Sequence, residues 1–196
     1  GLKRYPEAIA AADAALSLAK NSSIAALAER AEAHFSAHQD SAGIKDYNTL
    51  DHRLQQSTKP REKAFILAKL ANLNWLRGNR SLAMKQVNKS ISLDPPSASY
   101  YQQLGDYKVL DNKIPEALQC FEKAATNHGN EQLLAWKKAR AFSLSMQQKY
   151  RLHDAKELKI KLRIDEKLAY CEYWKAAFNA GYTNKQDELN FSFICQ

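Results

Sequence analysis

Two short segments far apart in the chain have nearly the same sequence, and together they predict a repeating helical structure. Tyr5-Pro6-Glu7-Ala8-Ile9 is matched by Ile114-Pro115-Glu116-Ala117-Leu118. Proline in the first turn of a helix costs no hydrogen bond, and a glutamate beside it interacts favourably with the positive end of the helix dipole. Each segment therefore predicts the start of a helix, followed by an alanine where a second helix can approach closely.

Small residues recur at two positions, one on each helix of an expected pair. The first-helix positions are Ala31, Ala71, Gly105, Ala139 and Ala177, and the second-helix positions are Ala8, Gly43, Ala83, Ala117 and Ala155. From Ala31 to Gly43 the gap is 12 residues, whereas from Ala139 to Ala155 it is 16. The surplus is about one helical turn, so we expect a lengthened first helix in that unit.

The best-preserved unit resembles the tetratricopeptide repeat (TPR) family, whose pattern is W-x2-L-G-x2-Y followed by A-x3-F. The residues that carry the resemblance are Tyr101, Leu104, Gly105, Ala117, Phe121 and Ala124. Lys108 replaces an aromatic residue of the pattern, and Gly129 stands where proline is common. Ala83 and Ala117 lie 34 residues apart, which is the period of this family. The resemblance implies an all-α fold: a superhelical array of antiparallel helix pairs, or TPR-like α-solenoid.

The expected organisation is a single TPR-like repeat domain over residues 1–196. Because the chain starts with Gly1 and inside a repeat, we expect it to be a piece of a longer protein. The expected units are 1–22 (partial), 23–63, 64–97, 98–131, 132–168 and a terminal or capping segment, 169–196. Residues 158–164 alternate apolar and polar side chains, which indicates a strand, but the flanking sequence favours a helix. For the tail from 181 to 196, the sequence is compatible with a final helix, an extended segment or a cap.

The three cysteines, Cys120, Cys171 and Cys195, contain no short pairing motif. We therefore expect free, partly buried thiols rather than a disulfide or a zinc site, which points weakly to a reducing compartment. His34 and His38 have the i, i+4 spacing of helical metal ligands, but no H-E-x-x-H motif is present. His153-Asp154 near Cys171 is an equally weak nucleophile pair. We expect no enzyme activity, no cofactor and no metal.

In the resembling family, the first helices line a concave groove. In the aligned units, polar and basic residues line this groove, which suits the binding of an extended peptide. An acidic group of the peptide would pair with Lys69 or Lys137. Trp75 and Trp136 are either packing residues or binding anchors on this wall. Some family members grip a C-terminal carboxylate; Asn72 matches that clamp, whereas Ala68 and Leu133 replace two of its lysines. The expected peptide-binding residues are Phe65, Lys69, Asn72, Gln102, Gln103, Asp106, Trp136, Lys137 and Arg140.

Basic residues concentrate between Lys137 and Lys167, a segment that contains ten Lys or Arg and four acidic residues. Such a stripe would bind an acidic protein, anionic lipid or nucleic acid, or would simply be solvated. Nucleic acid is disfavoured because no nucleic-acid-binding motif accompanies the stripe. No apolar stretch approaches the roughly 20 residues of a membrane span.

The sequence thus predicts a protein-interaction scaffold that binds a peptide or partner protein, including one with an acidic segment. One predicted setting is the assembly arm of a bacterial envelope, secretion or receptor protein. The alternatives are the recruiting arm of a larger enzyme and a nucleic-acid-associated module that uses the 137–167 stripe. The compartment stays open between the cytoplasm and the bacterial periplasm or cell envelope.

Overall fold

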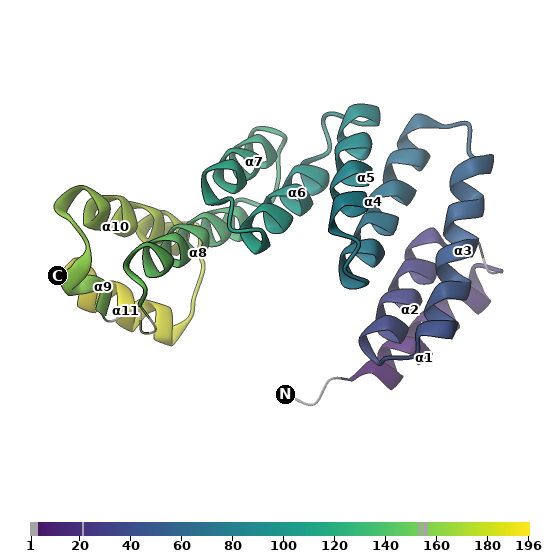
Figure 1. The fold of residues 1–196 in the computed structure, drawn as a ribbon, viewed down its shortest axis with the longest axis horizontal. Coiled ribbons are helices and arrows are strands. Elements are labelled where there is room, and N and C mark those ends of the chain that lie inside the picture. The colour runs from purple at the N-terminus through teal and green to yellow at the C-terminus, as the bar shows by residue number, and fades with distance from the viewer. Residues whose placement is uncertain (1–3, 21, 153, 155–156) are drawn as a thin grey trace. The chain divides into compact units, whose positions relative to one another are not determined.

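Every regular element in the described part of the chain is a helix, which confirms the expected all-α class. The computed structural model describes residues 4–20, 22–152, 154 and 157–196. Contacts divide the chain into two units, Gly1–Pro96 and Ser97–Gln196. The helices of the first unit are α1 (Tyr5–Leu18), α2 (Ile24–Ser36), α3 (Asp40–Gln56), α4 (Pro60–Leu76) and α5 (Arg80–Leu93) (Figure 1). Those of the second are α6 (Ala98–Leu110), α7 (Ile114–Thr126), α8 (Glu131–Tyr150), α9 (Leu158–Lys161), α10 (Ile164–Asn179) and α11 (Lys185–Cys195).

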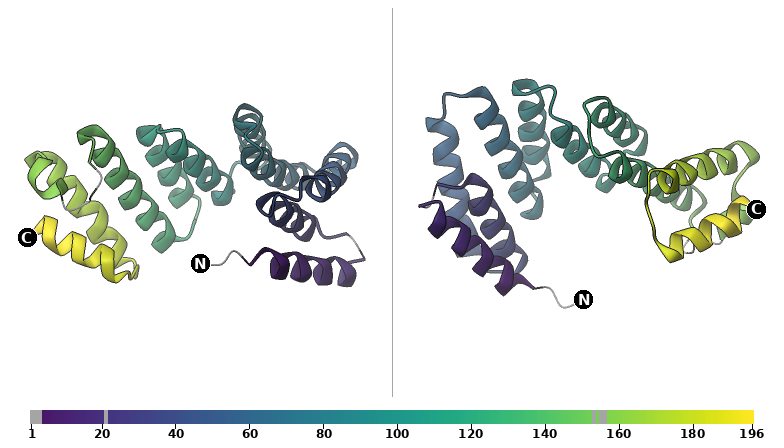
Figure 2. Two further views of the ribbon diagram at one scale, coloured as in Figure 1. Left: turned by 60° about the horizontal axis from the view of Figure 1, so that its bottom comes forward. Right: turned by 180° about the vertical axis from the view of Figure 1, so that it is seen from behind.

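In the first unit, consecutive helices fold back on one another through short turns (Figure 2). The turn before α2 ends at Ser23, whose side chain accepts a hydrogen bond from the Ala26 amide and so caps the helix. Leu16, Leu50 and Leu70, from α1, α3 and α4, are almost completely buried in one apolar core. Burial of these apolar side chains is the main force that holds the pairs together.

In the second unit, α10 is the antiparallel partner of α8. Near the start of α8, the Gln132 side chain donates a hydrogen bond to the carbonyl of Gly181, just after α10 ends. Near the end of α8, Lys149 pairs with Glu166 in the first turn of α10. Ala177, which the small-residue pattern predicts on a first helix, therefore lies on the second helix of this pair.

The small-residue positions lie at tight helix contacts. Ala31, Ala71, Ala83, Ala117, Ala139 and Ala177 are all completely buried. A Cβ atom added to Gly105 would lie 2.5 Å from the ring of Phe121 on α7, so only glycine fits this approach. Ala8 differs, because it is exposed and no described helix covers it. Ala155 lies outside the described residues.

The expectation of free cysteines is wrong for two of the three. Cys171 on α10 and Cys195 on α11 form a disulfide, with their Cα atoms 5.8 Å apart, whereas Cys120 is free. The two cysteines are 24 residues apart in sequence and form no short motif. They meet because the chain after α10 turns back and packs α11 against it. The indication of a reducing compartment therefore loses its basis.

The segment 158–164 is neither a strand nor one continuous helix. Residues Leu158–Lys161 form α9, and the backbone is then extended at Leu162 and Arg163 before α10 begins. Leu158 and Ile160, which a strand would place on the same face, lie in different environments: Leu158 is buried, whereas Ile160 is 84% exposed. The tail is helical from Lys185 to Cys195, and its Ile194 is buried in the core with Tyr170 and Trp174.

Candidate functional site

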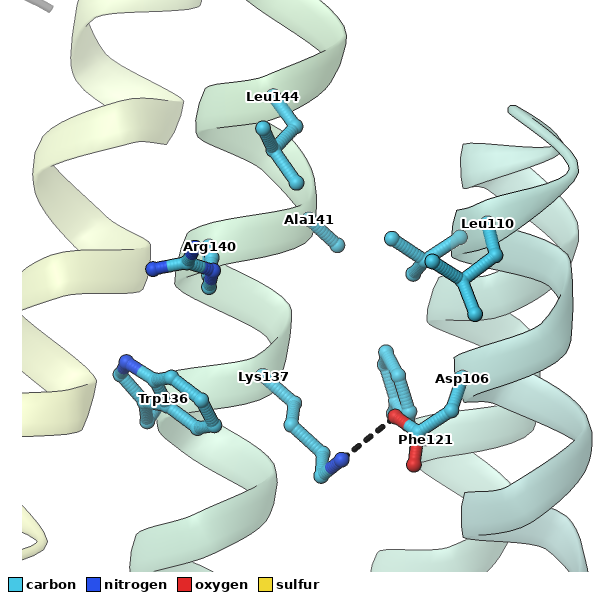
Figure 3. A pocket seen from close by; sticks show the side chains of 9 residues that line it. Asp106, Leu110, Phe121, Trp136, Lys137, Arg140, Ala141 and Leu144 are labelled. Carbon is cyan, nitrogen blue, oxygen red and sulfur yellow. Dashed lines mark hydrogen bonds and ion pairs between the residues drawn. The ribbon is translucent and has the colours of Figure 1, made fainter. Parts of the chain in front are cut away.

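A cavity of about 220 Å³ opens between α6 and α8 in the second unit (Figure 3). Its walls are mainly apolar, and its charged groups come from one turn of each helix. The residues that line it are Asp106, Val109, Leu110, Phe121, Trp136, Lys137, Arg140, Ala141 and Leu144. Apolar cavities with a few convergent polar groups are typical of binding sites.

Helical spacing brings these side chains to one place. Asp106, Val109 and Leu110 are three and four residues apart on α6, so they share a face. Trp136, Arg140 and Leu144 are successive i, i+4 neighbours on α8, as Figure 3 shows. Phe121 of α7 also lines the cavity, and its ring packs against the backbone of Gly105 on α6.

An ion pair joins the two walls of the cavity. Lys137 Nζ donates to Asp106 Oδ1 at 2.5 Å, drawn as the dashed line in Figure 3. Burial raises the pKa of Asp106 above its ordinary value, while the hydrogen bond and charge of Lys137 act in the opposite direction. Lys137 is therefore occupied in holding α8 to α6, and its charge is already partly balanced within the chain.

Arg140 is the cation that the cavity leaves available. Its guanidinium lies 5.8 Å from the ring centroid of Trp136, a cation–π distance. Within the described part of the chain it makes no hydrogen bond or ion pair. Trp136 is itself stacked on Tyr182, with 5.8 Å between the ring centroids, and this fixes the aromatic wall beside Arg140. The site therefore combines an apolar recess with an exposed positive charge.

Four of the nine expected peptide-binding residues line this cavity: Asp106, Trp136, Lys137 and Arg140. Gln102 and Gln103 precede them on α6 without lining it, and Gln103 Nε2 donates to the Tyr107 hydroxyl at 2.8 Å.

The other three expected residues lie on α4 of the first unit. Phe65 is 36% exposed, and Lys69 Nζ lies 5.4 Å from its ring centroid. Asn72, the residue that matches the carboxylate clamp, already donates from Nδ2 to Glu32 Oε2 at 2.8 Å. Its amide is therefore engaged within the chain.

Sequence reasoning missed the apolar walls, Val109, Leu110, Phe121, Ala141 and Leu144, because apolar residues on a repeat helix are normally assigned to the core. Leu110, the last residue of α6, is 62% exposed, and nothing in its place in the sequence distinguishes it from a core residue.

Neither a metal cluster nor a membrane span is found in the described residues. No group of three or more His, Cys, Asp or Glu side chains there is arranged to hold a metal ion. His34, considered as a ligand, has Nδ1 in a 2.7 Å hydrogen bond with Gln39 Oε1. His153 lies outside the described residues. None of the described helices has the length and apolar character needed to cross a bilayer.

Comparison with known proteins rests on structure, because no family model and no curated protein matches the sequence. The crystal structure of MamA superposes with a TM-score of 0.53 at 16% identity, over 90% of this chain and 88% of that one. The C-terminal part of a TPR repeat-containing protein from Cytophaga hutchinsonii gives a TM-score of 0.50 at 18% identity, over 97% of this chain and 74% of the other. Both likenesses span nearly the whole sequence, and the helix-pair architecture, the buried small residues and these two structures agree: the chain has the fold of the tetratricopeptide repeat proteins.

Proposed function

We propose that this chain is a protein-interaction scaffold that binds a peptide on the α6–α8 face, with an apolar side chain in the cavity and a carboxylate on Arg140. The observation that carries the proposal is the apolar cavity with an unpaired guanidinium beside it. A cavity of about 220 Å³ is of the size of one large side chain rather than a cofactor, since small-molecule sites usually measure roughly 300–1,000 Å³.

The charge of the site supports a peptide that carries an acidic group next to its apolar residue. Asp106 is balanced by Lys137, so the charge left over at the cavity is that of Arg140. Arginine binds carboxylates through two parallel hydrogen bonds, which gives orientation as well as affinity. Trp136, beside Arg140, would cover the bound peptide and exclude water from this contact.

The basic stripe supports nucleic-acid binding less well than its sequence suggests. Lys137, Lys138, Lys149 and Arg163 each form an ion pair within the chain, with Asp106, Glu122, Glu166 and Asp165 respectively. These pairs reduce the charge that would otherwise attract a phosphate backbone. A peptide therefore remains the better-supported ligand.

Among the settings predicted from the sequence, the disulfide favours the bacterial envelope. Disulfides persist in oxidising compartments such as the periplasm and are rare in the cytosol. We therefore extend the proposal to an assembly arm of an envelope protein, ahead of a recruiting arm of a larger enzyme.

The test is to select peptides that bind the full chain from a random display library and to measure the affinity of the selected peptides by calorimetry. Leu110→Asp places a charge on the apolar wall, and Arg140→Glu reverses the available cation. We expect each variant to weaken binding about tenfold or more, the loss typical of a binding hot spot.

Matched controls lie on α5. Leu82→Asp and Lys85→Glu change an exposed leucine and an exposed lysine in the same way, and neither residue lines the cavity. Both controls should bind the selected peptides as the wild type does. Equal affinity of Leu110→Asp, Arg140→Glu and the wild type would show that the peptides bind elsewhere.

A further inference from the structure

Two isoleucines near the junction of α9 and α10 stand almost fully in solvent. Ile160 is 84% exposed and Ile164 is 83% exposed, and Leu168, one turn further along α10, is 61% exposed. Leu158 and Leu162 pack into the core of the second unit. Ile160 lies two residues after Leu158 in α9, which on a helix is nearly the opposite side, so it faces solvent.

Lysine and arginine lie next to these apolar residues along the chain. Lys159, Lys161 and Arg163 are exposed, and Lys167 is partly so. Acidic groups cancel only part of this charge, because Arg163 pairs with Asp165, whereas Lys159, Lys161 and Lys167 form no ion pair among the described residues. Glu166 is buried and accepts hydrogen bonds from Lys149 and Tyr150, so Asp165, paired with Arg163, is the one exposed carboxylate between 158 and 168.

Two contacts join this region to the neighbouring helices. Lys159 Nζ lies 4.6 Å from the ring centroid of Phe193, which connects α9 to the exposed side of α11. Phe193 is itself 48% exposed and extends the apolar area. The disulfide between Cys171 and Cys195 fixes α11 to α10. The exposed residues thus lie on helices that are joined to α11.

We propose that a basic–apolar surface at the junction of α9 and α10 docks on an anionic lipid bilayer. The surface is formed by Lys159, Ile160, Lys161, Arg163, Ile164 and Leu168. The isoleucines and Leu168 would enter the boundary between headgroups and acyl chains, as the apolar faces of peripheral helices do. The basic side chains would remain at the level of the lipid phosphates, where each favours binding to an anionic membrane.

The shape of the surface favours lipid over a protein partner. Side chains that are more than 80% exposed protrude, and a protein would need a matching hollow for each of them. A bilayer interface accepts protruding apolar side chains without a preformed recess. The basic side chains of the surface would also be attracted by the phosphates of an anionic leaflet.

The surface is independent of the proposed peptide site, since none of its six residues lines the α6–α8 cavity. The test is co-sedimentation of the full chain with large unilamellar vesicles, either phosphatidylcholine alone or phosphatidylcholine with about 30% phosphatidylglycerol. We expect binding to the anionic vesicles that is at least about tenfold stronger than binding to the neutral ones and that falls as salt is raised.

Two double variants separate the apolar and electrostatic contributions. Ile160→Ser/Ile164→Ser and Lys159→Gln/Lys161→Gln should each weaken binding to the anionic vesicles by about tenfold or more. Circular dichroism should show that both remain folded, because all four side chains are exposed. Lys85→Gln/Lys89→Gln on α5 removes the same net charge from an exposed helix face of the first unit and should leave binding unchanged.

Three outcomes would overturn the proposal. The first is equal sedimentation with neutral and anionic vesicles. The second is an equal loss in the α5 control, which would mean that only net charge matters. The third is undiminished binding by the isoleucine variant together with equally tight, salt-sensitive binding to duplex DNA or an acidic peptide, because the surface would then be a general polyanion site.

Discussion

Gly105 of α6 and Phe121 of α7 are in such close contact that a single added carbon would collide: a Cβ on Gly105 would lie 2.5 Å from Cε1 of the ring. The same contact occurs with the roles reversed in the α2–α3 pair. There Gly43 lies on the second helix, and its Cβ would lie 2.8 Å from the ring of Phe35 on the first. One aromatic ring over one glycine thus sets the separation of both pairs.

Gly105→Ala should therefore destabilise the protein, although alanine is the better helix former by about 1 kcal/mol. The ring of Phe121 is 1% exposed and would have to shift from its packed position, so overpacking should cost about 1–3 kcal/mol and outweigh the gain in propensity. Denaturant unfolding measures the difference. The double variant Gly105→Ala/Phe121→Leu should recover part of the loss, and a Gly105→Ala protein more stable than the wild type would refute this account.

Much of the fold was predictable because it depends on local residue size. Glycine and alanine at Gly105 and Ala117 allow helices to approach closely, and such positions are visible in the sequence. The pairing of α8 with α10 was harder to predict, since the connection between them contains an extended break at Leu162 and Arg163. The alternation over 158–164 is a sign of extended backbone, but the flanking sequence favours a helix, so the sequence places Ala177 on the wrong helix of its pair.

The charged residues of the candidate site and Trp136 were predictable, whereas its aliphatic walls were not. Asp106, Lys137 and Arg140 are recognisable as outward residues of repeat helices, and they lie together at the cavity. Whether an apolar residue such as Leu144 lines a cavity or fills the core depends on the distance between α6 and α8, which sequence periodicity does not encode. The disulfide had the same difficulty, because only the folded hairpin of α10 and α11 brings Cys171 close to Cys195.

Reducing the Cys171–Cys195 disulfide should lower the stability of the second unit. The bond closes a loop between cysteines 24 residues apart, for which the loss is about 2–4 kcal/mol. Thermal unfolding with and without dithiothreitol measures this, and Cys171→Ser should reproduce the reduced midpoint and no longer respond to the reductant. Cys120→Ser is the control, since Cys120 is free and should retain the full response. Recovery of three reactive thiols from the denatured, unreduced protein would contradict the pairing.

Glu166 should make stability depend on pH in the acid range. Burial alone would raise the pKa of Glu166, but hydrogen bonds from Lys149, Tyr150 and the Arg163 amide outweigh it and lower the pKa from 4.5 to about 2. A lowered carboxyl pKa stabilises the fold above the unfolded value and loses this effect as the pH falls through the folded value. The free energy of unfolding should therefore decrease between about pH 4.5 and pH 2.

The matched variants for this prediction are both on α10. Glu166→Gln removes the titrating group and should flatten the pH dependence of the unfolding free energy in that window. Glu172→Gln, on an exposed part of the same helix, should keep the wild-type slope. Equal slopes for the wild type and Glu166→Gln would show that Glu166 does not titrate in this way.

The ion pair across the cavity makes a separate prediction about Asp106. Burial raises the pKa of this carboxyl, and Lys137 opposes the rise. Lys137→Met keeps the length of the side chain without its charge, so the pKa of Asp106 should rise further, as carbon-detected NMR titration of the carboxyl groups would measure. Because a raised carboxyl pKa favours the folded state only at low pH, the variant should lose stability relative to the wild type as the pH rises from about 4 to neutral. Lys138→Met is the control, since Lys138 pairs with Glu122 instead and the pKa of Asp106 should not change. An unchanged pKa of Asp106 in Lys137→Met would mean that the two side chains do not pair in solution.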